Sequence, residues 1–593
     1  MDTITSRQQY QDVGDIVTKR GGHTQRVRAR KREPPQRKPR GCPPPRAPMP
    51  DISSRTPRHR SLPDGRMRAP RQPIGASPRK SSIARSRRMT DHSHIDRGMA
   101  RGAAWMMLYK IVDRAIGLVS ITILARLLMP ADFGVVTLAA STLVLLEVLG
   151  AVGLDIALIQ HRDAGRRQLD AAWTFNVLFG LVTAAVAIAL APVVAHAFGD
   201  PRLLPALVVT GASRALQGCE NIGIIAFRRE LRFEREFRYR AFRRVATSLL
   251  VTLPLAYLLR DYRAFVFGSL AGSAIGVAAS YALHAYRPRL ALAGLRELLH
   301  FSRWLYIANV ADALHGRLAD LIVGYATGTA GVGALGVARD VARLPREFVA
   351  PVHRAVFPGY VQLAGDRALL RRGYLKVTSA LMLLLVPAGI GLALLAAPVT
   401  ALVLGTQWTH AVPVVRLLAI DSIFLVLLST AHHVNLAVGM SRSTTLVLLF
   451  DLAITLPLLL VLVPLDGIRG AALAALLGSI CTAPLNLRLL ARAIEFGRRE
   501  LLLLLGRPLA GALGMAPVVV ALAIAWPEPD AAAARAGHLL LLVGAGALTY
   551  FAIVLLLWLR AGEPDGPEAW AVRRLRAGWQ ALRVRKPLGR EAP

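Results

Sequence analysis

Basic side chains at helical spacing interrupt apolar stretches of this sequence. Lys110 and Arg114 are four residues apart, so on a helix they share one face. Further along the chain, Arg339, Arg343 and Arg346 recur at intervals of four and three and form a second stripe. The guanidinium fork matches phosphate oxygens, so an excess of arginine in apolar surroundings suits an anion such as a pyrophosphate.

Acidic side chains beside these bases allow a second interpretation. Asp113 would neutralise Lys110, and Asp340 would neutralise Arg343, while Glu347 borders the same stripe. Arginines near a helix end would then extend to the membrane interface. An ionisable group inside a membrane span costs at least about 2.5 kcal/mol, so each one is expected to face either a partner or a wet cavity.

Acids inside a span are also candidates for binding a cation or relaying protons. In a third charged stretch, Arg317 lies about 140° from Asp312 on a helical wheel, so the charged groups there cannot all share one face. For anion binding, the candidates are Lys110, Arg114, Arg317, Arg339, Arg343 and Arg346. For ion coupling, they are Asp113, Asp312 and Asp320. Weaker candidates for coupling or proton relay are Glu147, Asp155, Arg214, Glu220, Asp421, His432, His433 and Asn435.

No motif for catalysis or cofactor binding is recognised. The three cysteines are far apart and have no histidine at ligand spacing, so neither a disulfide framework nor a metal site is predicted. The G-x-G-x-x-G at 331–336 follows no strand, which argues against dinucleotide binding. We expect no catalytic residue, no metal and no cofactor, and the chain is not expected to be an enzyme.

The composition shows which elements must position the charged groups. The chain has 593 residues and a net charge of +36, yet 54% of it is hydrophobic. Apolar runs of about 20 residues match the roughly 30 Å of bilayer hydrocarbon, so an all-α polytopic membrane protein is predicted. The fourteen expected spans are 105–128, 133–155, 171–198, 203–226, 241–259, 264–286, 303–326, 331–361, 374–398, 411–438, 443–464, 467–491, 500–526 and 537–559.

The connecting loops predict the orientation of these spans. One alternating set of loops holds 24 Lys and Arg residues and the other set holds 5. Loops rich in Lys and Arg stay in the cytoplasm, so both termini are predicted to be cytoplasmic. The basic loop 227–244 is expected to lie on anionic lipid headgroups rather than on nucleic acid.

The chain also divides into segments. Residues 1–98 are rich in Arg and Pro and lack apolar periodicity, so a disordered tail is predicted. An offset of 199 residues aligns Trp105 with Trp304 and Gly134 with Gly333, with six spans between the copies, which predicts two parallel repeats. The expected domains are a six-helix bundle at 99–290, a second at 291–497, two further helices at 498–560 and a basic cytoplasmic tail at 561–593.

Several motifs resemble a known family. They are the stretches 101–105 (RGAAW), 123–134 (ILARLLMPADFG), 301–304 (FSRW), 320–324 (DLIVG) and 333–338 (GALGVA). Together they resemble the polysaccharide-transporter family, the O-antigen and exopolysaccharide flippases of the multidrug/oligosaccharidyl-lipid/polysaccharide exporter superfamily. The long basic amino-terminal tail departs from that family.

The resemblance implies translocation of an undecaprenyl-pyrophosphate-linked oligosaccharide across the bacterial inner membrane, for lipopolysaccharide or exopolysaccharide synthesis. It also implies membrane lipids, a polysaccharide polymerase and assembly proteins as partners, and in some relatives coupling to Na⁺ or H⁺. A cation-coupled multidrug exporter, a flippase for the peptidoglycan-precursor lipid and a non-transporting assembly partner remain alternatives.

Overall fold

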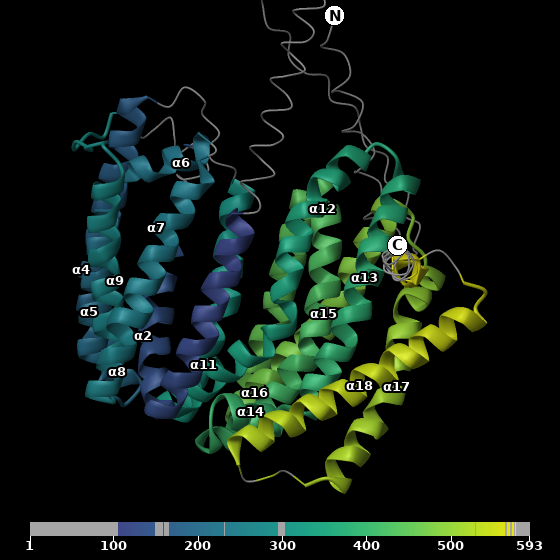
Figure 1. Cartoon of the computed structure of the whole chain (residues 1–593). Helices are drawn as coiled ribbons and strands as arrows, with labels where there is room; N and C mark the ends of the chain where they lie inside the picture. Colours follow the sequence, from purple (N-terminus) through teal and green to yellow (C-terminus); the bar gives the residue numbers. More distant parts are fainter. Residues whose placement is uncertain are drawn as a thin grey trace, which may run out of the picture. The chain divides into compact units, whose positions relative to one another are not determined.

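The computed structural model describes residues 105–148, 158, 165–230, 232–293, 303–527, 529, 531–563, 566–569, 572–574 and 576 (Figure 1). These residues form helices and connecting turns and contain no strand. The predicted tail 1–98 lies outside the described residues, as does most of the predicted carboxy-terminal tail.

The first half of the chain contains a helix over 105–127 and a series of helices packed beside it. The series is α2 (Pro130–Val148), α4 (Arg166–Ala197), α5 (Leu203–Gly218), the 3₁₀ turn η2 (Ile222–Ile224), α6 (Ile225–Arg229), α7 (Phe233–Val245), the π-helical segment η3 (Ala246–Thr252), α8 (Leu253–Leu259) and α9 (Arg263–Leu283). Helix α7 runs directly into η3 and α8. The basic segment that was expected to be a loop at the membrane surface is therefore largely the start of a membrane-crossing helix.

The second half contains two long helical segments with internal kinks. Its elements are α11 (Arg303–Ala342), η4 (Leu344–Phe348), α12 (Val349–Leu363), α13 (Arg367–Leu394), α14 (Ala396–Val403), η5 (Thr406–Ala411), α15 (Val412–Ala437), α16 (Ser441–Ile494), α17 (Arg498–Ala525) and α18 (Ala532–Arg560). Helix α11 is broken at Gly328 and α16 at Asp466 and Gly467. At the second break the chain reverses its direction. The contact between the backbone of Gly470 and the carbonyl of Leu462 shows this, because residues eight apart on one continuous helix do not touch.

Within the described residues, ten helices are long and apolar enough to cross a membrane. Two of these ten, α11 and α16, contain the kinks just described, so one helix in this count can hold more than one membrane span. The predicted span 331–361 is also not one α-helix. Pro345 lies at the start of the 3₁₀ segment η4, which separates α11 from α12. The stripe of arginines predicted on a continuous helix therefore bends after Arg343.

The two sequence copies pack against each other through their matched glycines. A Cβ atom at Gly134 would overlap the backbone carbonyl of Thr329, and one at Gly333 would overlap the carbonyl of Pro130. Position 130 matches 329, and 134 matches 333, at the offset of 199 residues. The contact is thus reciprocal, as a two-fold axis between parallel copies would produce. Only glycine lets α2 and α11 approach this closely.

Loops that were predicted to share one side of the membrane meet at one end of the bundle. Trp408 Nε1 donates a hydrogen bond to the carbonyl of Ala125, at 2.9 Å, and joins η5 to the end of the first helix. The side chain of Phe198 lies against Gly324, and Ile468 lies near Gly331. A buried apolar cluster that includes Leu138, Val332 and Trp408 fills this end of the structure.

Candidate functional site

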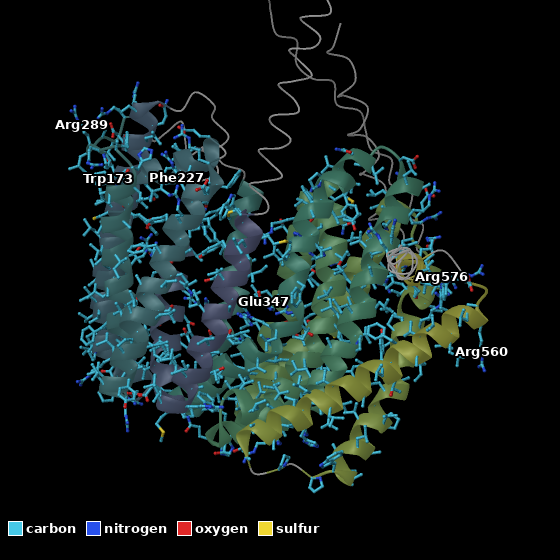
Figure 2. The ribbon with its side chains drawn as sticks, in the orientation of Figure 1. Trp173, Phe227, Arg289, Glu347, Arg560 and Arg576 are labelled. Carbon is cyan, nitrogen blue, oxygen red and sulfur yellow. The ribbon has the colours of Figure 1, made fainter. Side chains whose placement is uncertain are left out.

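Arg114 connects the first helix to the segment around η4. Its Nη1 lies 3.4 Å from Glu347 Oε1, and its Nη2 lies 3.5 Å from the carbonyl oxygen of Asp340. Figure 2 shows Glu347 at the boundary between the first helix and the helices of the second half. The structure therefore brings together two charged stretches that the sequence places more than 200 residues apart.

Asp320 is held by two arginines and a serine. Arg339 Nη1 lies 2.9 Å from one carboxylate oxygen, Arg317 Nη1 lies 3.6 Å from the other, and Ser141 donates a hydrogen bond of 2.8 Å. The Asp320 side chain is completely buried. A buried carboxylate with these partners is a structural ion pair that ties α2 to α11, and both of its oxygens are occupied.

Arg343 and Arg346 are less completely neutralised. The closest ion pair of Arg343 is with Asp340, at 3.8 Å, and its side chain is 48% exposed. The Nε atom of Arg346 is buried and has no hydrogen-bond partner. Both residues line a cavity of about 690 Å³ that also contains His353 and His433. A buried guanidinium nitrogen without a partner is available for a ligand oxygen.

The candidates on the first helix do not pair with each other as the sequence predicts. Lys110 is exposed, and Asp113 pairs with Arg244 on α7, at 3.0 Å, instead of with Lys110. The side chain of Asp312 lies outside the described residues. Of the candidate set, Arg114 meets Asp340 and Glu347, the two acids beside the predicted arginine stripe. Arg317 and Arg339 form a separate cluster around the buried Asp320.

A second cavity, of about 560 Å³, lies between the halves and is lined by Arg114, Arg244 and Asp340. It adjoins a cavity of about 860 Å³ inside the first bundle, because both are lined by Arg244, Thr247 and Ser269. Sequence reasoning missed Arg240, Arg243 and Arg244 of α7 as lining residues, since it assigned this segment to lipid headgroups. The signal that could have found them is the run of Glu and Arg continuing into an apolar span.

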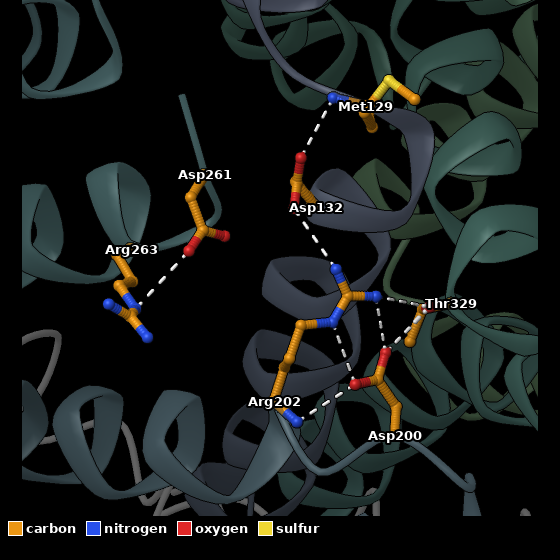
Figure 3. Close-up of polar contacts among 7 residues, drawn as sticks. All are labelled: Met129, Asp132, Asp200, Arg202, Asp261, Arg263 and Thr329. Atoms are coloured by element: carbon orange, nitrogen blue, oxygen red, sulfur yellow. Dashed lines mark hydrogen bonds and ion pairs between the residues drawn. The ribbon is translucent and has the colours of Figure 1, made fainter. Parts of the chain in front are cut away.

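At the opposite end, four polar residues form what we call the loop clasp: Asp132, Asp200, Arg202 and Thr329 (Figure 3). Arg202 contacts Asp200 at 2.8 Å and Asp132 at 3.4 Å, and Thr329 donates a hydrogen bond of 3.0 Å to Asp200. Burial alone would raise the pKa of Asp200, but its hydrogen bonds from Arg202 and Thr329 outweigh burial and hold the pKa below the ordinary value. Asp200 therefore stays ionised, and the clasp links the two halves at this end.

Part of the chain matches a known protein family. A family described as "Polysaccharide biosynthesis protein" matches residues 123–413. The match covers just under half of the chain. The matched segment contains α2, the kinked helix α11 and the arginines at 317, 339, 343 and 346, whereas Arg114 precedes it.

Two curated relatives extend the family match. The lipopolysaccharide biosynthesis protein WzxC of Escherichia coli (strain K12) is 24% identical over 54% of this chain and 66% of its own length. The succinoglycan biosynthesis transport protein ExoT of Rhizobium meliloti (strain 1021) is 24% identical over 56% of this chain and 68% of its own length. The chain thus spans about two thirds of each relative.

A solved structure establishes the fold. The lipid II flippase MurJ, in an inward closed conformation, superposes with a TM-score of 0.64 at 13% identity, over 77% of this chain and 99% of MurJ. The described residues are therefore helical and have the fold of this protein, and the chain is a multi-pass membrane protein.

Proposed function

We propose that the protein is a flippase that moves an undecaprenyl-pyrophosphate-linked oligosaccharide across the inner membrane for lipopolysaccharide or exopolysaccharide synthesis. The match to the polysaccharide biosynthesis family and the two relatives support this assignment. The observation that carries it is the group of arginines at the cavities beside Glu347, where Arg343 is half exposed and Arg346 retains an unpartnered nitrogen.

The geometry suggests how the substrate is held. Arg114, Arg343 and Arg346 bind the pyrophosphate, since each presents N–H donors at a cavity wall. The sugars enter the cavities, and the lipid tail stays in the bilayer. Opening of the loop clasp, with closure at the opposite end, releases the sugars on the far side. Of the three main candidates for ion coupling, Asp113, whose carboxylate pairs with Arg244, is the one described residue that is not already held by two arginines.

The alternatives differ in substrate. A multidrug exporter for cations is disfavoured, because the cavity beside η4 is lined by Arg343, Arg346 and Arg354 against Glu347 and Asp451. A flippase for the peptidoglycan precursor would need the same pyrophosphate contacts, and the resemblance to MurJ is one of fold. The motifs and the family match favour the polysaccharide substrate over this second candidate.

Deletion of the gene tests the function. In the deletion strain we expect lipid-linked glycan to accumulate on the inner leaflet and surface polysaccharide to be lost, because the carrier cannot cross unaided. Plasmid-borne wild-type protein should restore surface polysaccharide, as measured by gel and by sugar composition. Normal surface polysaccharide, with accumulation of the peptidoglycan precursor, would instead support the second candidate.

We further propose that both termini are cytoplasmic, that each half is a six-helix bundle, and that a polysaccharide polymerase acts next to the protein.

The orientation is tested with single cysteines at two exposed sites, Arg263 and Arg372. These sites belong to loops that are predicted to lie on opposite sides of the membrane. A membrane-impermeant maleimide should label the cysteine at 263 in intact cells and the one at 372 only after lysis. Labelling of both in intact cells would contradict the topology.

A further inference from the structure

Most of the residues that line the cavity inside the first bundle are polar or charged. It measures about 860 Å³, which lies within the usual range for ligand pockets. Charged residues reach it from several elements: Glu147 from α2, Arg214 from α5 and Arg243 from α7. Polar groups inside a membrane bundle are costly unless they line a wet cavity or have partners.

Each acid of this cavity has an arginine partner. Glu147 lies 2.6 Å from Arg214, and Glu220 lies 3.2 Å from Arg243. Asp113 pairs with Arg244 as described, and Glu236 lies close to both Arg228 and Arg240. The wall therefore has little free positive charge, and it presents carboxylate acceptors beside guanidinium donors.

Hydroxyl side chains line the same cavity and form hydrogen bonds with these ion-paired groups or with one another. Tyr239 Oη donates a hydrogen bond of 2.5 Å to Glu220, and Ser213 lies 3.0 Å from Ser269 and 2.9 Å from Ser273. A wall with alternating donors and acceptors can exchange its own hydrogen bonds for those of a polyhydroxyl ligand without exposing an uncompensated charge.

The cavity beside η4 differs in how its arginines are paired: Arg346 Nε has no hydrogen-bond partner, and the closest ion pair of Arg343 is as long as 3.8 Å. A dianion is therefore better stabilised near η4 than inside the first bundle. The cavity that Arg114 and Asp340 line lies between these two cavities. It shares Arg244 with the cavity of the first bundle, and Arg114 pairs with Glu347, which lines the cavity beside η4.

We propose that the cavity of the first bundle is a sugar subsite, which binds the uncharged sugars next to the pyrophosphate while Arg114 and the arginines near η4 bind the pyrophosphate itself. This inference rests on the proposed flippase function. Glu147, Arg214 and Tyr239 bind sugar hydroxyls, and their ion pairs and hydrogen bonds reorganise around the ligand.

The test compares two lipids. One is the lipid-linked glycan extracted from the deletion strain, and the other is undecaprenyl pyrophosphate without sugars. Binding of each to the purified full-length protein is measured by native mass spectrometry. The wild type should bind the glycan lipid at least about tenfold more tightly, because several hydrogen bonds to charged groups form only with the sugars.

The double variant Glu147→Gln with Arg214→Gln removes both charges of one pair and leaves no orphaned partner. It should bring the ratio of the two affinities close to one and leave the affinity for undecaprenyl pyrophosphate unchanged. Tyr239→Phe, which keeps the ring, should reduce the ratio less and serves if the double variant does not fold. The matched control is Glu234→Gln with Arg238→Gln, an exposed pair on α7 that lines no described cavity, and it should keep the wild-type ratio.

An equal loss of affinity for both lipids, or an unchanged ratio in both cavity variants, would overturn the sugar subsite. So would a wild-type protein that binds undecaprenyl pyrophosphate but shows no preference for the glycan, in which case the proposed function stands. A wild-type protein that binds neither lipid would overturn the proposed function and the subsite with it.

Discussion

Arg114→Ala and Arg343→Ala should each reduce export of the glycan by roughly ten- to a hundredfold, with the protein still present in the membrane. A charge-assisted hydrogen bond contributes about 1.5 to 3 kcal/mol, and losing one at the step that moves the pyrophosphate slows that step accordingly. Arg114→Lys and Arg343→Lys should be milder, since the charge remains and only the fork geometry is lost. Export is measured as surface polysaccharide after a pulse of labelled sugar, normalised to membrane protein.

A second variant separates substrate binding from charge neutralisation. Arg114 lies 3.4 Å from Glu347, so Arg114→Ala leaves this acid without a partner. If Arg114 serves only to neutralise Glu347, adding Glu347→Gln to Arg114→Ala should restore export, and this result would contradict the pyrophosphate site. We expect no rescue. Arg367→Ala is the control, because Arg367 pairs with Glu495 in an exposed position and should export normally.

Gly134→Ala and Gly333→Ala should lower the melting temperature of the purified protein strongly. The added methyl group would overlap a backbone carbonyl of the opposing helix, and backbone atoms cannot move aside as a flexible side chain can. Overpacking of a core typically costs about 1 to 3 kcal/mol, and we expect at least the upper end because α2 and α11 must separate. Thermal unfolding in detergent, followed by size-exclusion chromatography, measures the loss.

Gly316→Ala is the matched control for these two variants. Gly316 is also a helical glycine of α11, but nothing lies within 4 Å of its Cβ position. Alanine there should raise stability slightly, by about 0.5 to 1 kcal/mol, because it restricts the unfolded chain and favours the helix. Equal melting temperatures for Gly134→Ala and Gly316→Ala would show that the reciprocal glycine contact is not required.

The candidate site was predictable only in part. Arg114, Arg339 and Arg343 could be identified because a charge in an apolar run is unusual, and this property is local to the sequence. Their partners could not be identified. Asp113 pairs with Arg244 and Glu347 with Arg114, whereas helical spacing favours the nearest opposite charge on the same helix.

The sequence by itself determined the membrane class, the family resemblance, the repeat and the helices that carry charge. Apolar length, loop charge and matched residues can be found along the chain without knowing how the helices pack. The tertiary structure decided which charges meet, where the arginine stripe bends at η4, and that Arg240, Arg243 and Arg244 of α7 line a cavity. The physical reason is that helical periodicity gives a direction around one axis. The distance between two charges on different helices depends on how closely the helices pack, and here the closest approach is set by Gly134 and Gly333.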